Sequence, residues 1–112
     1  MAGKNAFYES QALVIKALAH PARLLIVNRL TKRPVCVCEL TQAVGCDIST
    51  VSQHLAVLRR AGIVDSEKKA NKVFYSLKCP CVLDFLGCIM RVVKTNARRQ
   101  VKLALSRGGK EY

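Results

Sequence analysis

Apolar residues recur at helical spacing through the first thirty positions of the chain. One stripe predicts an amphipathic helix over residues 6–19. Its members are Leu13, Val14, Ala17 and Leu18. His20 and Pro21 interrupt the stripe, and proline is favoured at the first position of a helix because its missing N–H would be unpaired there. We therefore expect a second helix over residues 21–30, followed by a basic connection over residues 31–34.

The middle of the chain carries the pattern of a helix-turn-helix. A short third helix is expected from residue 36 or 37 up to Gly45, which suits the left-handed conformation that ends helices. Asp47 is a favourable N-cap for a fourth helix. Cys46 and Val51 flank that cap as a hydrophobic staple, so Cys46 is interpreted as a core residue and not as a ligand.

The fourth helix has an apolar face and a polar face. Val51, Leu55 and Leu58 recur at helical spacing and are expected to face inward. Arg59 and Arg60 place cations at the negative end of the helix dipole. The polar face lies in the N-terminal half of this helix and is expected to contact DNA. Its residues are Ser49, Thr50, Ser52, Gln53 and His54.

A wing and a last helix complete the pattern. Two short strands, residues 63–64 and 73–77, are predicted around a basic loop at 66–72. Pro80 opens a final helix whose apolar face is too broad for so small a domain to cover, so we expect it to pack on a second subunit. The residues assigned to this dimer contact are Leu83, Leu86, Ile89 and Val93, supported by Phe85 and Met90.

The chain is therefore predicted to be a single homodimeric winged helix-turn-helix domain over residues 1–112, mainly α with a small β-hairpin. Its 112 residues are 51% hydrophobic, which is enough for one core. The predicted parts are the N-terminal helices (6–31), the helix-turn-helix (36–62), the wing (63–78) and the C-terminal dimerisation helix (80–105).

Charge points to nucleic acid as the partner. Nineteen Lys and Arg against seven Asp and Glu give a net charge of +12, and such a field attracts phosphate. A merely soluble basic protein is the plainer interpretation of charge alone. A membrane partner is not expected, because the basic residues do not share one amphipathic helix with a bulky aromatic face. The residues expected to contact phosphate are Arg59, Arg60, Lys68, Lys69 and Lys72.

The chemistry expected of the six cysteines depends on whether the protein is in a reducing or an oxidising compartment. The first twenty residues contain no continuous apolar segment of the signal-peptide kind, and the longest apolar runs are far shorter than the ~20 residues of a membrane span. A cytoplasmic location is expected, where thiols stay reduced. Closely spaced cysteines there indicate a metal, metalloid or redox site.

Cys36 and Cys38 are the leading candidate ligands. They lie near a helix N-terminus, just after Lys32 and Arg33, which favours the thiolate form. In a regular helix two residues this far apart diverge by about 200°. Joint ligation therefore requires an irregular first turn, and a change in that turn would move the DNA-reading element.

Three further cysteines are candidates for ligation or redox pairing. Cys79 and Cys81 flank Pro80 at the start of the last helix, where thiolates are favoured. Cys88 lies on the same helical face as Cys81 but about 10 Å away. These two cannot share one ion within one chain, but a two-fold axis could bring them together. His20, beside Pro21, is interpreted as structural, and no arrangement of nucleophile, base and acid indicates an enzyme.

Three separated motifs carry a family resemblance. They are residues 17–23 (ALAHPAR), 36–40 (CVCEL) and 51–64 (VSQHLAVLRRAGIV). Together they resemble the ArsR/SmtB family of winged-helix repressors, in the family's order and spacing, over residues 10–90. The resemblance implies a homodimer held by its first and last helices that binds an operator in double-stranded DNA. The CVCEL segment resembles the arsenite and antimonite site of the arsenic repressors, in which metalloid binding distorts the third helix and releases the DNA.

One position departs from that arsenic site. Repressors with a third thiolate three residues after the second have Cys there, and this chain has Thr41. A trigonal As(III) or Sb(III) ion prefers three soft sulfurs, so the third would come from elsewhere, whereas methylated trivalent arsenic needs only two. The family's other metal site, of Asp and His on the last helix, is expected to be missing because the two histidines are His20 and His54.

The expected function is therefore a repressor with no permanent cofactor, released when As(III) or Sb(III) bonds to thiolates that include Cys36 and Cys38. One alternative on the same fold is a redox or persulfide sensor in which cysteines of the early and last helices crosslink. Cadmium or lead sensing is another. An alternative of a different class is a constitutive DNA-binding protein whose cysteines are packing residues.

Overall fold

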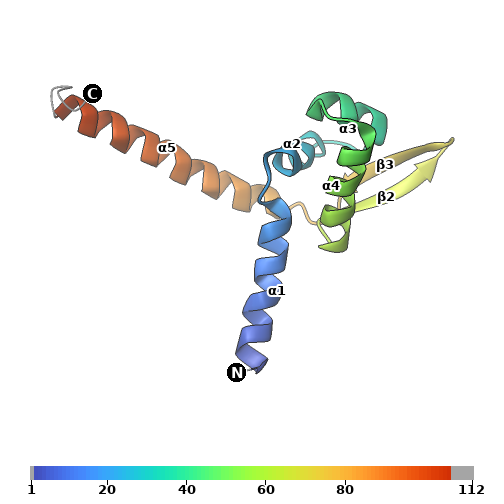
Figure 1. Ribbon diagram of the computed structural model, residues 1–112, viewed down its shortest axis with the longest axis horizontal. Helices are drawn as coiled ribbons and strands as arrows, with labels where there is room; N and C mark the ends of the chain where they lie inside the picture. The colour runs from blue at the N-terminus through green and yellow to red at the C-terminus, as the bar shows by residue number, and fades with distance from the viewer. Residues whose placement is uncertain (1, 107–112) are drawn as a thin grey trace. The chain divides into compact units, whose positions relative to one another are not determined.

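The computed structural model describes residues 2–106, which form helices and one small sheet (Figure 1). The elements in chain order are α1 (Ala2–Leu18), α2 (Pro21–Arg29), β1 (Val35–Cys36), α3 (Val37–Val44), α4 (Ile48–Arg60), β2 (Val64–Lys69), β3 (Lys72–Leu77) and α5 (Val82–Ser106). They divide into two compact units. The first ends at Pro80 and contains everything up to β3, and the second begins at Cys81 and contains α5.

The core of the first unit gathers apolar side chains from its helices and from the start of β2. Each of the three central helices buries a face against its neighbours, as their apolar spacing requires. The completely buried side chains are Ile26, Val27, Leu40, Val51, Leu55 and Leu58, with Val64 at 2% exposure. The predicted inward face of α4 is thus confirmed.

The helix ends follow local sequence rules. The Nδ1 of His20 accepts a hydrogen bond of 3.0 Å from the amide of Ala22 and so caps the start of α2, which confirms a structural role for this histidine. Gly45 has φ +80° and ends α3, and its amide donates to the carbonyl of Thr41 at 3.0 Å. Cys46 is exposed, so its assignment to the core was wrong. It lies in the turn between α3 and α4, outside their apolar contact.

The wing is larger than the predicted hairpin. Its antiparallel strands are ordered β1-β3-β2, and β1 is a third strand that the sequence pattern did not indicate. β2 and β3 extend almost to the tip, where only Ala70 and Asn71 form the turn. Both have positive φ, 49° and 69°, as a two-residue type I′ turn requires. The basic segment that was expected to be a loop is therefore mostly strand.

Two helices expose long apolar faces. In α1 only Ala17 and Leu18 of the predicted stripe are buried, while Leu13 is 66% exposed. In α5 the exposed residues include Ile89 and Val93, at 45% and 52%. Within the described part of the chain no single helix is long and apolar enough to cross a membrane; taken together, α1 and α2 meet the length and composition criteria, but they are bent by 82°.

Candidate nucleic-acid interface and thiol site

The exposed side of α4 carries small polar side chains of the kind that contact base edges. Burial of its apolar face turns the other faces outward. The exposed polar side chains in its first two turns are Ser49, Ser52 and Gln53. Thr50 is half-buried, and its hydroxyl donates to Oδ1 of Asp47 at 2.5 Å. Thr50 therefore supports the start of the helix, and DNA contacts by Thr50 and by the three exposed residues stay predictions.

His54 is not part of that exposed face. It is half-buried, its Nδ1 accepts a hydrogen bond of 3.1 Å from Nε of Arg23, and its ring centroid lies 4.4 Å from that of His20. Burial lowers the pKa of His54, and the neighbouring His20 and Arg23 lower it further. The ring thus links α4 to the start of α2, and a contact between His54 and DNA stays a prediction.

The basic residues expected to contact phosphate all lie at the surface. Lys69 and Lys72 face each other across the last rung of the β2–β3 ladder, and Lys68 pairs with Val73 beside them. Lys69 lies 3.7 Å from Glu67, and both side chains of this ion pair are about 70% exposed, so the pair leaves the lysine accessible. Arg59 and Arg60 are likewise exposed at the end of α4.

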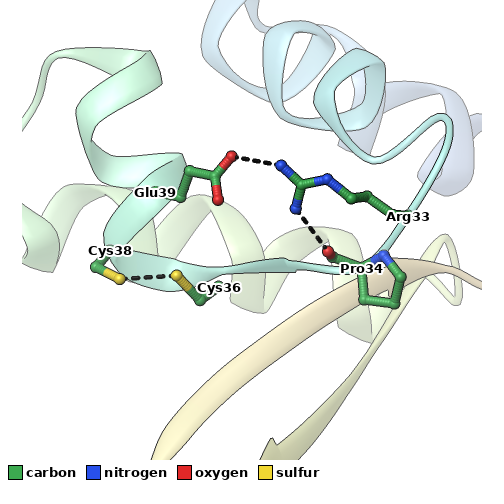
Figure 2. Close-up of polar contacts among 5 residues, drawn as sticks. All are labelled: Arg33, Pro34, Cys36, Cys38 and Glu39. Carbon is green, nitrogen blue, oxygen red and sulfur yellow. Dashed lines mark hydrogen bonds and ion pairs between the residues drawn. The ribbon is translucent and has the colours of Figure 1, made fainter.

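The two leading thiols meet where β1 becomes α3. Cys36 ends the strand and is the N-cap of the helix, with φ −78° and ψ 155°, whereas Cys38 is already helical. Because only one of the two is in helical conformation, their side chains do not diverge as they would inside a helix. Their Sγ atoms lie 2.7 Å apart (Figure 2). The irregular first turn that joint ligation by the two cysteines requires is thus present.

This contact makes the two thiols unequal as acids. Cys36 is buried and Cys38 is exposed. A hydrogen bond from Cys38, reinforced by the amide of Glu39 and the charge of Lys72, lowers the pKa of Cys36. The same hydrogen bond raises the pKa of Cys38. The contact therefore makes Cys36 the more acidic of the two thiols.

The cation that assists the thiols is not the predicted one. Arg33 donates from Nη2 to Glu39 at 2.9 Å and from Nη1 to the carbonyl of Pro34 at 3.2 Å (Figure 2). These bonds tie Arg33 to the first turn of α3 and not to the sulfurs. Lys72 instead supplies the positive charge that helps to lower the pKa of Cys36. It lies on β3, and only the unpredicted pairing of β1 with β3 brings it near.

The remaining cysteines do not complete a three-sulfur site among the described residues. Across residues 2–106 no group of three His, Cys, Asp or Glu side chains is arranged to hold a metal ion. Cys79 follows β3 in the first unit, while Cys81 and Cys88 belong to the second. Cys88 is exposed and accepts a long contact of 3.9 Å from Arg91. A ligand role for these three stays a prediction.

Comparison with known proteins identifies the family. The family described as bacterial regulatory protein, arsR family, matches residues 20–66. The uncharacterized HTH-type transcriptional regulator Rv0081 of Mycobacterium tuberculosis is 39% identical over 87 residues, which cover 77% of this chain and 76% of the relative. The chain belongs to the arsR family. It is accordingly a winged helix-turn-helix transcriptional regulator that binds DNA, and it is not an enzyme.

Two further similar proteins add detail. The Biofilm growth-associated repressor of Agrobacterium fabrum is 44% identical over 66 residues, 59% of this chain and 56% of the relative. A solution structure of a winged helix-turn-helix domain of Mb0332 from Mycobacterium bovis, described as homodimeric, matches with a TM-score of 0.75 at 26% identity. That match covers 88% of this chain and 95% of the other.

Proposed function

We propose that this arsR-family regulator is a cytoplasmic homodimeric repressor that leaves its operator when a thiophilic inducer bonds to Cys36 and Cys38. Trivalent arsenic or antimony is the leading inducer. The single observation that carries the proposal is the 2.7 Å contact between the two sulfurs at the start of α3. Soft sulfur ligands suit these metalloids, and the fold of the chain brings two of them together at one point.

The position of the pair supports coupling to DNA. The β1 end of the junction is hydrogen-bonded to β3 in the wing, with Cys36 opposite Phe74. The other end continues into α3, which contacts α4. Both DNA-contacting elements are thus joined to the same two residues. A change in backbone at Cys36 would move the wing and α4 relative to each other.

Inducer binding would act on this junction directly. Cys36 is buried where the strand passes into the helix, and an ion bonded to both sulfurs ties its side chain to that of Cys38. The inducer would therefore set the backbone geometry between β1 and α3.

Dimer formation is supported by the exposed apolar faces and by a homodimeric relative. A DNA-binding protein of this size that leaves Ile89 and Val93 exposed on one helix has an unsatisfied apolar surface. Covering that surface with a second copy would give two recognition helices related by a two-fold axis. Such a dimer fits a partly palindromic operator.

Redox or persulfide sensing is the second candidate. The neighbouring thiol of Cys38 lowers the pKa of Cys36, and a thiolate is the species that attacks sulfur electrophiles. In this alternative an early cysteine crosslinks to one of Cys79, Cys81 or Cys88. Cadmium or lead would use the same sulfurs as metal ligands.

One titration separates these possibilities. Mobility-shift assays of the reduced protein on its operator would be titrated with arsenite, methylated As(III), Cd(II) and a persulfide donor. Arsenite or methylated As(III) releasing the operator at the lowest concentration supports the leading proposal. Release by the persulfide donor alone would support the redox alternative, and binding that no reagent affects would indicate a constitutive DNA-binding protein.

A further inference from the structure

A hollow of about 330 Å³ lies on one face of the wing sheet. Its lining is mostly apolar and includes the ring of Phe74, with charged side chains at the edge. The lining residues are Arg33, Pro34, Glu67, Lys69, Phe74 and Ser76. A volume near 300 Å³ is the lower end of the range for small-molecule sites, so the space suits a group of about one ring.

The hollow and the thiol pair share a face. Phe74 is the direct cross-strand partner of Cys36, and such partners point to the same side with Cβ atoms about 5 Å apart. Pro34 lies two residues before Cys36 and therefore also on that side; Figure 2 shows both on the same side of the β1 ribbon. A ligand atom bonded to Cys36 would thus lie next to the hollow.

The number of sulfurs limits what that ligand is. The unit that ends at Pro80 brings two sulfurs together, and its described residues add no third His, Cys, Asp or Glu to the pair. A trivalent arsenic atom bonded to two thiolates keeps one valence. A carbon substituent fills this valence with no further protein ligand.

We propose, on the basis of the function proposed above, that the preferred inducer is a monosubstituted trivalent arsenical, R–As(OH)₂, whose organic group R occupies the hollow against Phe74. Two As–O bonds break and two As–S bonds form, to Cys36 and Cys38. The two thiol protons leave with the hydroxides as two molecules of water. Arsenic stays trivalent and its As–C bond stays intact, so the step needs no oxidant or reductant.

The lining predicts which R is favoured. Phe74 and Pro34 offer an apolar surface on which an aromatic ring stacks well. The charged side chains of the lining include Arg33 and Lys69, which each have an acidic neighbour, Glu39 and Glu67. A phenyl group fits this space and chemistry, whereas a methyl group fills little of it.

The test compares phenyl-As(III), methyl-As(III) and arsenite as releasing agents in mobility-shift titrations. For the wild-type chain we expect phenyl-As(III) to release the operator at a concentration at least tenfold below that of arsenite. Ser76→Phe, which fills the hollow, should remove the phenyl advantage and leave release by methyl-As(III) unchanged. Phe74→Ala should weaken the phenyl response. Val73→Ala is the matched control, because Val73 is the exposed neighbour on the opposite face.

Arsenic absorption spectroscopy of the phenyl adduct supplies a measurement that does not depend on DNA. Two sulfurs and one carbon around arsenic would support the proposal. Equal releasing concentrations of phenyl-As(III) and arsenite in the wild type, or a phenyl advantage that survives Ser76→Phe, would overturn it. If none of the three arsenicals released the wild-type protein, the proposed function itself would fail, which is a different result.

Discussion

The Nε of Arg23, in the first turn of α2, donates a hydrogen bond of 3.1 Å to Nδ1 of His54 in the middle of α4. The acceptor must be an unprotonated nitrogen, so the contact requires a neutral imidazole. The ring of His20 lies 4.4 Å away, and its own Nδ1 is occupied by the amide of Ala22. The start of α2 and the recognition helix are therefore held by a contact that one proton would break.

This contact predicts an acid-sensitive stability. Burial, followed by the charges of His20 and Arg23, lowers the pKa of His54 from its ordinary value of 6.5. The unfolded chain then binds more protons than the folded chain just below pH 6.5, so stability increases with pH in that window. The contribution is complete above pH 6.5 and is lost as the pH falls from there to the lowered pKa. Urea unfolding of the wild type and of His54→Gln between pH 5 and 8 measures it; an equal acid loss in both proteins would refute the assignment.

Sequence-specific binding should depend on Gln53. Its side chain is exposed in the second turn of α4, and a glutamine pairs with adenine through two hydrogen bonds. Gln53→Ala should cost about 1–3 kcal/mol of discrimination at one base pair of each half-site. Competition binding with single-base operator variants measures this loss, and an unchanged preference would remove Gln53 from the readout.

The wing lysines should instead change the salt dependence. Lys68 is exposed on β2 near the hairpin tip, where a phosphate contact releases counterions without reading sequence. Lys68→Gln should lower the magnitude of the slope of log K against log salt by about 1 for each phosphate that the protein no longer neutralises, and weaken all sequences alike. Glu67→Gln serves as a control that leaves this lysine in place. A Lys68→Gln slope identical to that of the wild type would exclude the contact.

Dimer formation should depend on the exposed face of α5. Ile89→Asp would bury a charge without a partner in the proposed interface, at a cost of several kcal/mol. Sedimentation should show a monomer. Thr95→Asp places the same side chain roughly 120° away around the helix and should leave the dimer intact. A dimeric Ile89→Asp protein would move the interface elsewhere.

Much of the fold follows from local rules. The apolar spacing of α4 and the left-handed Gly45 depend on residues within a few positions of each other, and both were predictable. The strand β1 was not, because two residues are too few to show an alternating pattern, and its pairing partner Tyr75 lies forty positions away. Contacts between residues so far apart along the chain leave no periodic pattern in the sequence.

The candidate site was predictable in its residues and not in its geometry. The spacing of Cys36 and Cys38 identified the pair, but their approach depends on a strand ending where a helix begins. The orientation of His54 depends on Arg23, thirty-one residues earlier. Phe74 has no recognisable motif, and only the register that places it opposite Cys36 connects it to the thiols.

The account depends most directly on the two sulfurs at the start of α3. Cys36→Ser and Cys38→Ser should each bind the operator as the wild type does, because neither thiol belongs to the DNA-contacting face. Each should lose release by trivalent arsenic, since serine oxygen does not replace a soft sulfur ligand. Cys46→Ser, at an exposed cysteine in the turn before α4, is the matched control and should respond normally.

The decisive measurement is therefore the concentration of trivalent arsenic that releases the operator from the wild type, Cys36→Ser, Cys38→Ser and Cys46→Ser proteins, measured side by side under reducing conditions. The account predicts release of the wild type and of Cys46→Ser at the same concentration, and retention of DNA by the other two variants at concentrations at least a hundredfold higher. Release of Cys36→Ser at the wild-type concentration would contradict it.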